Sequence, residues 1–251
     1  MSRRGIDLAV AEVNAGGGIR GHRLEIIAHD DSGDGARAAA IAQQFVDNEP
    51  VLAVIGHLTS RAMIAAARIY DGKLVAVTPT ASSPDLAGIS RWTFRVVSND
   101  SVAGITLGKF ATSLGYERAA ILYENNTYGR GLAESFQRNF GGRVVSMDPV
   151  AEEAQDFEPF VAYFRQQAPD VVFVVGQEGP GLALLREARR QRLETAFLGG
   201  DSWERVAGDT IASEGAYVGV PFSPDDPHPA AQRFVAAFRE KYGMLPDANA
   251  A

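Results

Sequence analysis

The sequence predicts an α/β protein of two lobes, each a mainly parallel sheet flanked by helices. Short apolar strands alternate with helices of about 10–15 residues along most of the chain, and this order implies parallel strands. The alternation starts again after Asp100, and about ten strands with about nine helices are too many for one doubly wound domain of ~150 residues. We therefore assign residues 1–98 and 221–251 to lobe 1 and residues 99–220 to lobe 2.

The composition excludes several classes of protein. The 251 residues are 46% hydrophobic, which is enough for one large or two modest cores. A net charge of −7 without a basic cluster makes nucleic acid and anionic membrane surfaces poor partners. The absence of cysteine excludes disulfides, thiolate zinc sites and a cysteine nucleophile. No apolar run approaches the ~20 residues of a membrane helix, and no signal-peptide h-region follows Met1. We expect neither a cofactor nor a metal.

The N-terminal segment predicts a helix followed by a strand. Residues Ser2–Asn14 place Ile6, Val10 and Val13 on one stripe of a helix, which the following glycines end. Residues Arg23–Ala28 alternate in polarity, as a strand with one buried face does.

The acidic segment His29–Asp34 has two interpretations. Its three carboxylates within five residues are a ligand type that suits calcium. The segment lacks, however, the alternating ligands, the glycine position and the distal glutamate of an EF-hand loop. We favour a turn that caps a helix over Gly35–Asn48.

The stretch Val51–Tyr70 carries the first candidate site. Its first five residues are apolar and mostly β-branched, which suits a strand buried on both faces. Gly56 ends this strand, and Thr59 or Ser60 caps a helix with apolar positions at Met63, Ala66, Ala67 and Tyr70. Free backbone N–H groups and the positive end of the helix dipole coincide there, so two hydroxyls suit a carboxylate. The alternative is a plain βα turn with an N-cap.

A second hydroxyl-rich loop follows the next strand. The strand Leu74–Val77 leads into the loop Thr78–Pro84, which contains two threonines and two serines. Because adjacent parallel strands end at the same edge of a sheet, we expect Ser60 and Ser82 to face one another. This convergence favours an anion site at that edge.

The remaining residues continue the alternation of strands and helices. A strand at Trp92–Val97 and a helix capped within Ser98–Asp100 and ending at Leu114 lead into lobe 2. The elements predicted after them are strands at Arg118–Tyr123, Arg143–Met147, Asp170–Val175, Ala196–Leu198 and Ala216–Val220, and helices at Tyr128–Phe140, Asp156–Gln167, Pro180–Gln191, Ser202–Asp209 and Pro229–Tyr242. Residues Pro246–Ala251 have the pattern of the start of another helix.

Two strands of lobe 2 end in candidate binding residues. Tyr128 can stack on a ligand or bond it through its hydroxyl, or it can merely pack beneath its own helix. Asp201 is the only acidic residue in the loop Gly199–Trp203, where a carboxylate suits a ligand's ammonium group; its alternative role is to cap the short helix. Trp203 either walls the pocket or packs in the core.

Nine segments lie in one order along nearly the whole chain: DLAVAEVNAGGGIRG (Asp7–Gly21), HDDSGD (His29–Asp34), VIGHLTS (Val54–Ser60), TPTASSPDL (Thr78–Leu86), FRVVSND (Phe94–Asp100), YGRGLA (Tyr128–Ala133), DF (Asp156–Phe157), PDVVFVVG (Pro169–Gly176) and FLGGDSW (Phe197–Trp203). Together they resemble the type I periplasmic binding proteins, and among these the branched-chain amino-acid (Leu/Ile/Val) binding family of ABC importers. Each segment is weakly specific alone, but the ordered set is strong.

The resemblance implies a two-lobed clamshell that binds an amino acid in its cleft. Tyr128 would then cover the ligand and Asp201 would take its α-ammonium group. Each lobe would hold one pole of a zwitterion, so the ligand would favour the closed form. Gln177 stands where the family often has an aromatic residue, a departure that bears on ligand identity. The residues expected to hold the α-carboxylate lie in the two hydroxyl loops: Thr59, Ser60, Thr80, Ala81 and Ser82.

By this resemblance we expect an extracytoplasmic, periplasmic protein that delivers its ligand to an ABC permease in the membrane, and we expect a monomer. A ligand-sensing receptor module of the same fold is the nearest alternative. An alternative from another class is a small-molecule hydrolase, with His57 as the candidate base. The sequence has no G-x-S-x-G elbow, and its four histidines are scattered.

Compared with the family, the opening strand, the ligand-contacting loop after it and the signal peptide are missing before Met1, and roughly the last quarter of the family's length is missing after Ala251. We therefore expect the chain to be a fragment or a mis-started gene product. A chain without that central strand exposes two pairing edges and apolar faces. We therefore expect these 251 residues, expressed alone, to be unstable or to aggregate.

Overall fold

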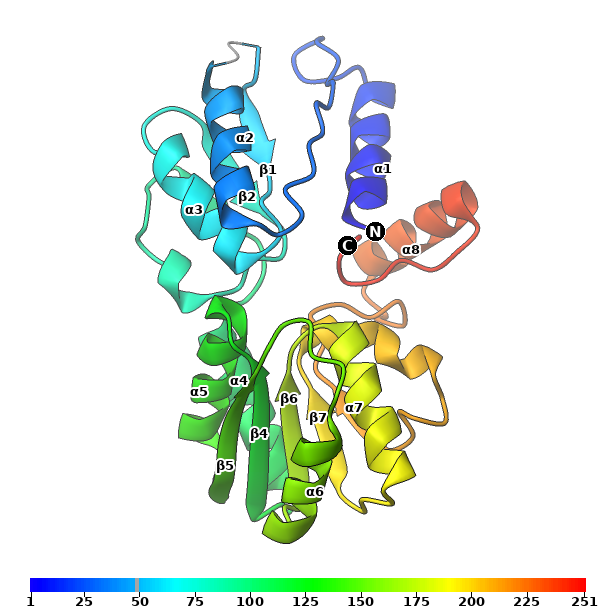
Figure 1. The fold of residues 1–251 in the computed structure, drawn as a ribbon. Helices are drawn as coiled ribbons and strands as arrows, with labels where there is room; N and C mark the ends of the chain where they lie inside the picture. The colour runs from blue at the N-terminus through cyan, green and yellow to red at the C-terminus, as the bar shows by residue number, and fades with distance from the viewer. Residues whose placement is uncertain (48–49) are drawn as a thin grey trace. The chain divides into compact units, whose positions relative to one another are not determined.

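Two parallel sheets, each flanked by helices, organise the protein (Figure 1). The structure is a computed structural model and describes residues 1–47 and 50–251. Within those ranges, the strand order is β1-β2-β3 in one sheet and β5-β4-β6-β7-β8 in the other. Every neighbouring pair of strands is parallel. The predicted fold class is thereby confirmed.

Helices and strands alternate along the chain, with boundaries within a few residues of the predicted ones. In order they are α1 (Ser2–Ala15), α2 (Gly35–Asp47), β1 (Ala53–Ile55), α3 (Ser60–Tyr70), β2 (Val75–Thr78), η1 (Pro84–Leu86), β3 (Thr93–Arg95), α4 (Asp100–Ser113), β4 (Arg118–Glu124), α5 (Thr127–Asn139), β5 (Arg143–Val150), α6 (Glu158–Gln167), β6 (Val171–Val175), α7 (Glu178–Arg190), β7 (Ala196–Gly199), η2 (Asp201–Gly208), β8 (Ala216–Val218) and α8 (Pro229–Tyr242). Asn48, the predicted last residue of the second helix, lies outside the described residues.

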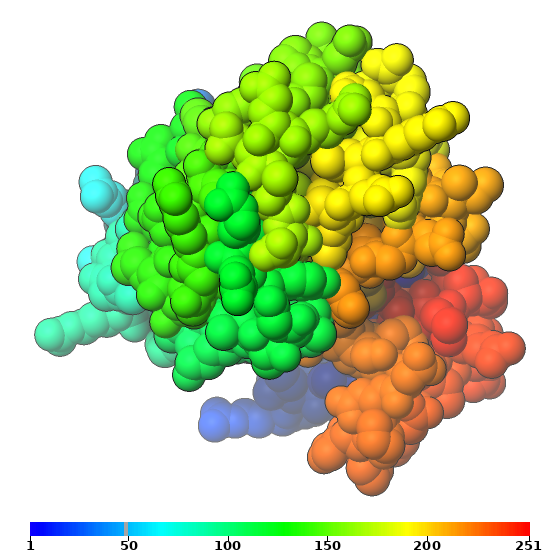
Figure 2. Space-filling model, turned by 90° about the horizontal axis from the view of Figure 1, so that it is seen from below, coloured from blue at the N-terminus to red at the C-terminus, as the bar shows by residue number. Residues whose placement is uncertain are grey.

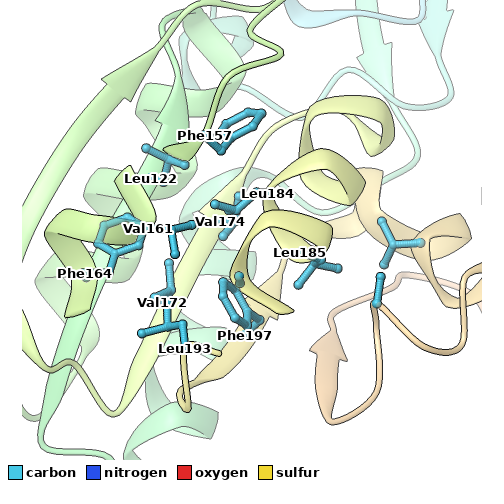
Figure 3. Packing of buried hydrophobic residues seen from close by; sticks show 14 of the residues in the cluster. Leu122, Phe157, Val161, Phe164, Val172, Val174, Leu184, Leu185, Leu193 and Phe197 are labelled. Carbon is cyan, nitrogen blue, oxygen red and sulfur yellow. The ribbon is translucent and has the colours of Figure 1, made fainter. Parts of the chain in front are cut away.

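The second sheet has a core on each face because side chains alternate along its strands. On β4, Ile121 points to the core under α4 and α5, and Leu122 points to the core under α6, α7 and η2. Figure 3 shows the latter core, where Phe157 and Leu184 lie near Val174. The strand β6 is buried along its whole length, as expected where helices cover both faces. In the space-filling view, the green to yellow segments form one continuous packed surface (Figure 2).

The first sheet is covered on one face by α2 and α3. Met63, Ala66, Ala67 and Tyr70, the predicted apolar stripe of α3, are all fully buried, and this prediction is confirmed. The prediction that the first strand is buried on both faces is wrong, because its side chains alternate in exposure. Val54 faces the helices, whereas Ile55 is 53% exposed on the opposite face.

The helices α1 and α8 belong to a separate compact unit made of residues 1–30 and 220–251. Its small core contains Leu8 and Phe238, and the Tyr242 hydroxyl donates a hydrogen bond to the Arg4 carbonyl at 3.0 Å. The predicted stripe of Ile6, Val10 and Val13 is displaced by this packing. The buried residues of α1 are Gly5 and Leu8, because a β-carbon at Gly5 would lie 2.0 Å from the Ala250 carbonyl oxygen.

The prediction of a strand over Arg23–Ala28 is wrong. Residues 23–28 form no strand, because a strand needs a partner and none of the described strands pairs with them. The backbone N–H and C=O of Leu24 instead bond the side chain of Asn14 at 2.8 and 3.0 Å. Residues 246–251 form a single turn, in which Asp247 Oδ1 accepts from the Asn249 N–H at 3.1 Å, and the start of a further helix there stays a prediction.

The second compact unit spans residues 31–219 and contains both sheets. Each sheet occupies its own stretch of that unit, and the change from one to the other falls at α4. The predicted lobe boundaries stay a prediction. Among the helices that the structure describes, none has the length and apolar character to span a bilayer.

Candidate ligand-binding site

Hydroxyl side chains join the two loops that follow β1 and β2. The exposed side chain of Thr59 caps α3. Ser60 Oγ accepts a hydrogen bond from the backbone N–H of Ser83 at 3.1 Å, and Thr80 Oγ1 donates to a carbonyl of the first loop at 2.6 Å. The two loops therefore meet at the carboxyl edge of the sheet, while the expected facing of Ser60 and Ser82 stays a prediction. Because Ser60 Oγ acts as an acceptor within the protein, its own O–H is left to donate.

The second loop is held from two sides. Thr78 Oγ1 donates to the His57 carbonyl at 2.6 Å and accepts from the Ala81 N–H at 3.1 Å. Arg95 Nη1 donates to the carbonyls of Ser82 and Ser83 at 3.1 and 2.8 Å. Ala81 and Ser82 are only 1% and 5% exposed, so this loop is preorganised rather than free to adapt.

His57 links three elements at the start of the first loop. Its Nδ1 lies 2.5 Å from Asp31 Oδ2, and its Nε2 lies 2.9 Å from the Tyr70 hydroxyl. Burial raises the pKa of Tyr70 above its usual range, and the negative charge of Asp31 raises it further, so Tyr70 keeps its proton. Because both ring nitrogens are engaged, His57 orders the loop and is poorly placed to act as a base.

Replacing Tyr70 with phenylalanine is expected to lower the free energy of unfolding by about 0.5–1.5 kcal/mol, because the buried bond to His57 is lost while the ring packing is kept. Tyr163 offers a matched control, since it is 37% exposed, and Tyr163→Phe is expected to change stability by less than ~0.5 kcal/mol. Urea denaturation of both variants gives the comparison. Equal losses would show that the Tyr70 hydroxyl does not stabilise this network.

Asp31 and Asp34 have structural roles, as favoured for the acidic segment. Asp34 Oδ1 accepts from the Arg37 N–H at 2.8 Å, which caps α2, and Asp31 Oδ1 accepts from the Gly33 N–H at 2.7 Å, which forms a turn. Among the residues placed by the structure, no group of three or more histidine, aspartate or glutamate side chains is arranged to hold a metal ion.

At the carboxyl edge of the second sheet, Tyr128 and Asp201 form one polar group. The Tyr128 hydroxyl donates to Asp201 Oδ1 at 2.7 Å and accepts from the Ser202 hydroxyl at 3.1 Å. The Ser202 N–H also donates to Asp201 Oδ1, at 3.0 Å. Burial raises the pKa of Tyr128 well above its usual range, and the charge of Asp201 adds to this, so Tyr128 stays a donor. Asp201 uses one oxygen for both bonds, which leaves the other for a ligand.

Gln177 and Trp203 lie in different surroundings. Gln177 is exposed at the N-terminus of α7, and its backbone N–H donates to Glu124 Oε1 at 2.6 Å. Trp203 is fully buried, and a β-carbon built at Gly181 or Gly199 would come within 2.4 Å of its indole ring. The structure thus places Trp203 in the core, as its packing alternative describes. The part that either residue plays toward a ligand stays a prediction.

The sequence interpretation missed Asp100 as a candidate. It treats Ser98–Asp100 as a helix cap, and Asn99 alone fills that role by accepting from the Val102 N–H at 3.0 Å. Asp100 itself is 2% exposed, and its N–H donates to the Ser82 carbonyl at 2.9 Å. An acidic residue in the first turn of a helix is ordinarily exposed, so the local pattern carries no sign of this burial.

The two polar groups have opposite chemical preferences. The hydroxyls at the N-terminus of α3 are donors beside a positive helix end, which suits a carboxylate. The carboxylate of Asp201 and the hydroxyl of Tyr128 suit an ammonium group.

An open depression of about 1000 Å³ lies at the other edge of the second sheet, lined by Tyr116, Arg165 and Arg192 among others, and is remote from both groups.

Comparison with known proteins identifies the family to which the chain belongs. A family profile described as "Periplasmic binding protein" matches residues 1–251. The chain belongs to the periplasmic binding protein family. In residues 31–219, this periplasmic binding protein has parallel sheets flanked by helices, with polar loops at the carboxyl ends of the strands.

Several relatives of this periplasmic binding protein have names that describe them as amino-acid binding proteins. The Leu/Ile/Val-binding protein of Escherichia coli strain K12 is 33% identical over 218 residues, a match of 84% of this chain and 59% of that protein. The chain therefore spans less than two thirds of the length of that curated relative.

Solved structures show the same similarity. An ABC transporter substrate-binding protein from Desulfitobacterium hafniense, in complex with Leu, is 34% identical with a TM-score of 0.85, covering 100% of this chain and 75% of its own. A branched-chain amino acid transporter substrate-binding protein from Streptococcus pneumoniae, in complex with isoleucine, is 26% identical with a TM-score of 0.92, covering 100% and 74%.

Proposed function

We propose that the chain is part of an extracytoplasmic solute-binding protein of an ABC importer, and that it binds an aliphatic amino acid and delivers it to a membrane permease. One observation carries this proposal. The strand ends of one sheet hold joined hydroxyl loops, and those of the other hold an aspartate beside a half-buried tyrosine. This pairing of donors with an acid matches the two poles of a zwitterion.

The roles of the individual residues follow from that division. Ser60 and the loop of Thr80, Ala81 and Ser82 hold the α-carboxylate, with Thr59 at the same helix end. Tyr128 covers the ligand, Asp201 takes the α-ammonium group, and Gln177 contacts the variable part of the ligand from the N-terminus of α7. The relatives support this assignment, since those with bound Leu and isoleucine share the fold.

The contacts of such a site are sufficient to bind an amino acid with micromolar affinity, and the proposed function requires no catalytic step. Charged hydrogen bonds contribute roughly 1.5–3 kcal/mol each, and micromolar affinity needs about 8 kcal/mol. Binding also orders the ligand and the loops, and this costs free energy. Three or four such contacts therefore reach this value only together with burial of the ligand's apolar part. We propose that the protein is not an enzyme, since His57, the best candidate base, has both ring nitrogens engaged.

We also propose that the protein is a monomer. Its lobes are divided as the sequence predicts, with residues 1–98 and 221–251 in one lobe and residues 99–220 in the other.

Calorimetric titration of a full-length protein that contains these 251 residues, with leucine as the ligand, tests the proposal. Leucine is expected to give saturable heat with micromolar affinity, whereas 4-methylpentanoate, which lacks the ammonium group, and leucinamide, which lacks the carboxylate, are each expected to bind at least tenfold more weakly. Incubation with leucine amides and esters should yield no product. Equal binding of leucine and both analogues would contradict the proposed recognition of a zwitterion, and turnover would contradict the assignment as a binding protein.

A further inference from the structure

Asp100 is buried beside both polar groups of the candidate site. Its backbone N–H donates to the Ser82 carbonyl at 2.9 Å, which ties the start of α4 to the second hydroxyl loop. Its side chain is 2% exposed, and no residue that the structure describes donates a hydrogen bond to the buried Oδ2. A β-carbon at Gly131 would lie 3.7 Å from this oxygen, and Gly131 is one helical turn from Tyr128 on α5.

An acidic oxygen in such a place calls for a donor. Buried polar groups are nearly always hydrogen-bonded, because an unpaired one keeps its full desolvation cost. Glu124, the other buried acid of this unit, is satisfied: it accepts from the Gln177 N–H at 2.6 Å and from Asn126 at 3.2 Å. Asp100 differs from Glu124 in having one carboxyl oxygen with no described partner, so its position points to a group that arrives from outside the chain.

The groups that face Asp100 come from several different elements. Burial raises its pKa to about 7; a hydrogen bond from the Ser82 side chain opposes this, the negative charge of Asp201 on η2 raises the pKa, and Arg95 on β3 lowers it. Tyr128 faces it from α5 and keeps its proton. The carboxyl group of Asp100 is therefore divided between its protonated and ionised forms near neutral pH, and a nearby cation would convert it to the ionised form.

We propose that Asp100 is a specificity-determining residue that pairs with the ammonium group of the ligand and releases its own proton when that ligand binds. This inference rests on the proposed function and extends it. The O–H bond of the protonated Asp100 breaks, its proton passes to the solvent, and the resulting carboxylate accepts a hydrogen bond from the ligand's N–H. Asp201 and Asp100 then share the ammonium group, which relieves the repulsion between them.

The proposal fixes the sign of the pH dependence. A positive ammonium group lowers the pKa of Asp100 in the complex, so amino-acid binding releases a proton below about pH 7 and tightens as the pH rises. If the ligand holds Asp100 ionised down to pH 6, affinity at pH 6 is about tenfold weaker than at pH 8. A ligand that carries only a carboxylate adds negative charge, so its binding takes up a proton and weakens as the pH rises.

Calorimetry in two buffers of different ionisation enthalpy, phosphate and imidazole, measures this proton directly. With leucine at pH 6.5, the wild-type full-length protein is expected to release roughly three-quarters of a proton per ligand, the fraction that a pKa of about 7 leaves protonated. Asp100→Asn keeps the size of the side chain and is expected to release none, with an affinity that stays flat between pH 6 and 8. Glu124→Gln removes the other buried acid and should release as many protons as the wild type.

The outcomes separate this inference from the proposed function. Leucine binding by the wild type without proton release overturns the role of Asp100 alone, whatever the variants do. Release that persists in Asp100→Asn, or that disappears in Glu124→Gln, also overturns it. The absence of saturable heat from the wild type with any amino acid at pH 8 overturns both proposals. Because the wild-type measurement decides by itself, a variant that fails to fold does not remove the test.

Discussion

Replacing Trp203 with alanine is expected to lower the free energy of unfolding by about 3–5 kcal/mol, because the whole indole ring is buried. Gly181 and Gly199 lie against the ring so closely that neither has room for a β-carbon, and neither has a side chain that can fill the cavity left behind. Since domains are stable by only about 5–15 kcal/mol, this loss is a large fraction of the total. Equilibrium denaturation in urea measures it.

The chain provides its own control, because it has only one other tryptophan. Trp92 is 39% exposed, and Trp92→Ala is expected to cost less than ~1 kcal/mol. The two single variants also separate the fluorescence of a buried indole from that of a partly exposed one. If Trp203→Ala keeps its stability but weakens leucine binding, Trp203 walls the site and its assignment to the core is wrong.

The parts of the fold that follow from local periodicity could be predicted. The apolar run Val171–Val175 indicates a strand, and the 3.6-residue stripe of α3 indicates a helix with one buried face. The meeting of Ser60 with the second hydroxyl loop also follows from the sequence, because parallel strands bring their carboxyl ends to one edge.

The parts that depend on partners distant in sequence could not be predicted. Residues 23–28 have the alternation of a strand, but pairing rather than pattern decides whether a strand forms. The buried face of α1 is set by the close approach of the Ala250 backbone to Gly5, which no periodicity records. Asp100 has the sequence of an ordinary first-turn acid, and only the packing around α5 removes it from water.

The same distinction between local pattern and distant packing explains why one carboxyl group of the candidate site can be found from the sequence and the other cannot. Asp201 stands out in the sequence because it is the only acid in a loop at a strand end. Asp100 stands out only once its burial and its unpaired oxygen are known. Burial raises the pKa of Asp100 and the negative charge of Asp201 raises it further, and a single positive group that both acids contact would lower that repulsion. Selection for an ammonium group is thus a property of the pair.

Replacing Asp201 with alanine is expected to weaken binding of leucine by at least tenfold, and binding of 4-methylpentanoate much less. In the complex the ammonium group would be largely removed from water, so the loss of Asp201 takes away one of its charged hydrogen bonds, each worth about 1.5–3 kcal/mol. Ser60→Ala should show the converse pattern, because any ligand that keeps its carboxylate loses the same hydroxyl. Calorimetry of both variants with both ligands measures the difference.

Asp201→Asn is the matched variant that separates charge from structure. Its amide oxygen can still accept from the Tyr128 hydroxyl and from the Ser202 N–H, so the geometry of the loop is kept while the negative charge is lost. If charge recognition is the role of Asp201, the asparagine variant discriminates against leucine as strongly as the alanine variant does. If the asparagine variant binds leucine as the wild type does, Asp201 only positions Tyr128, and the ammonium group must be held by another residue.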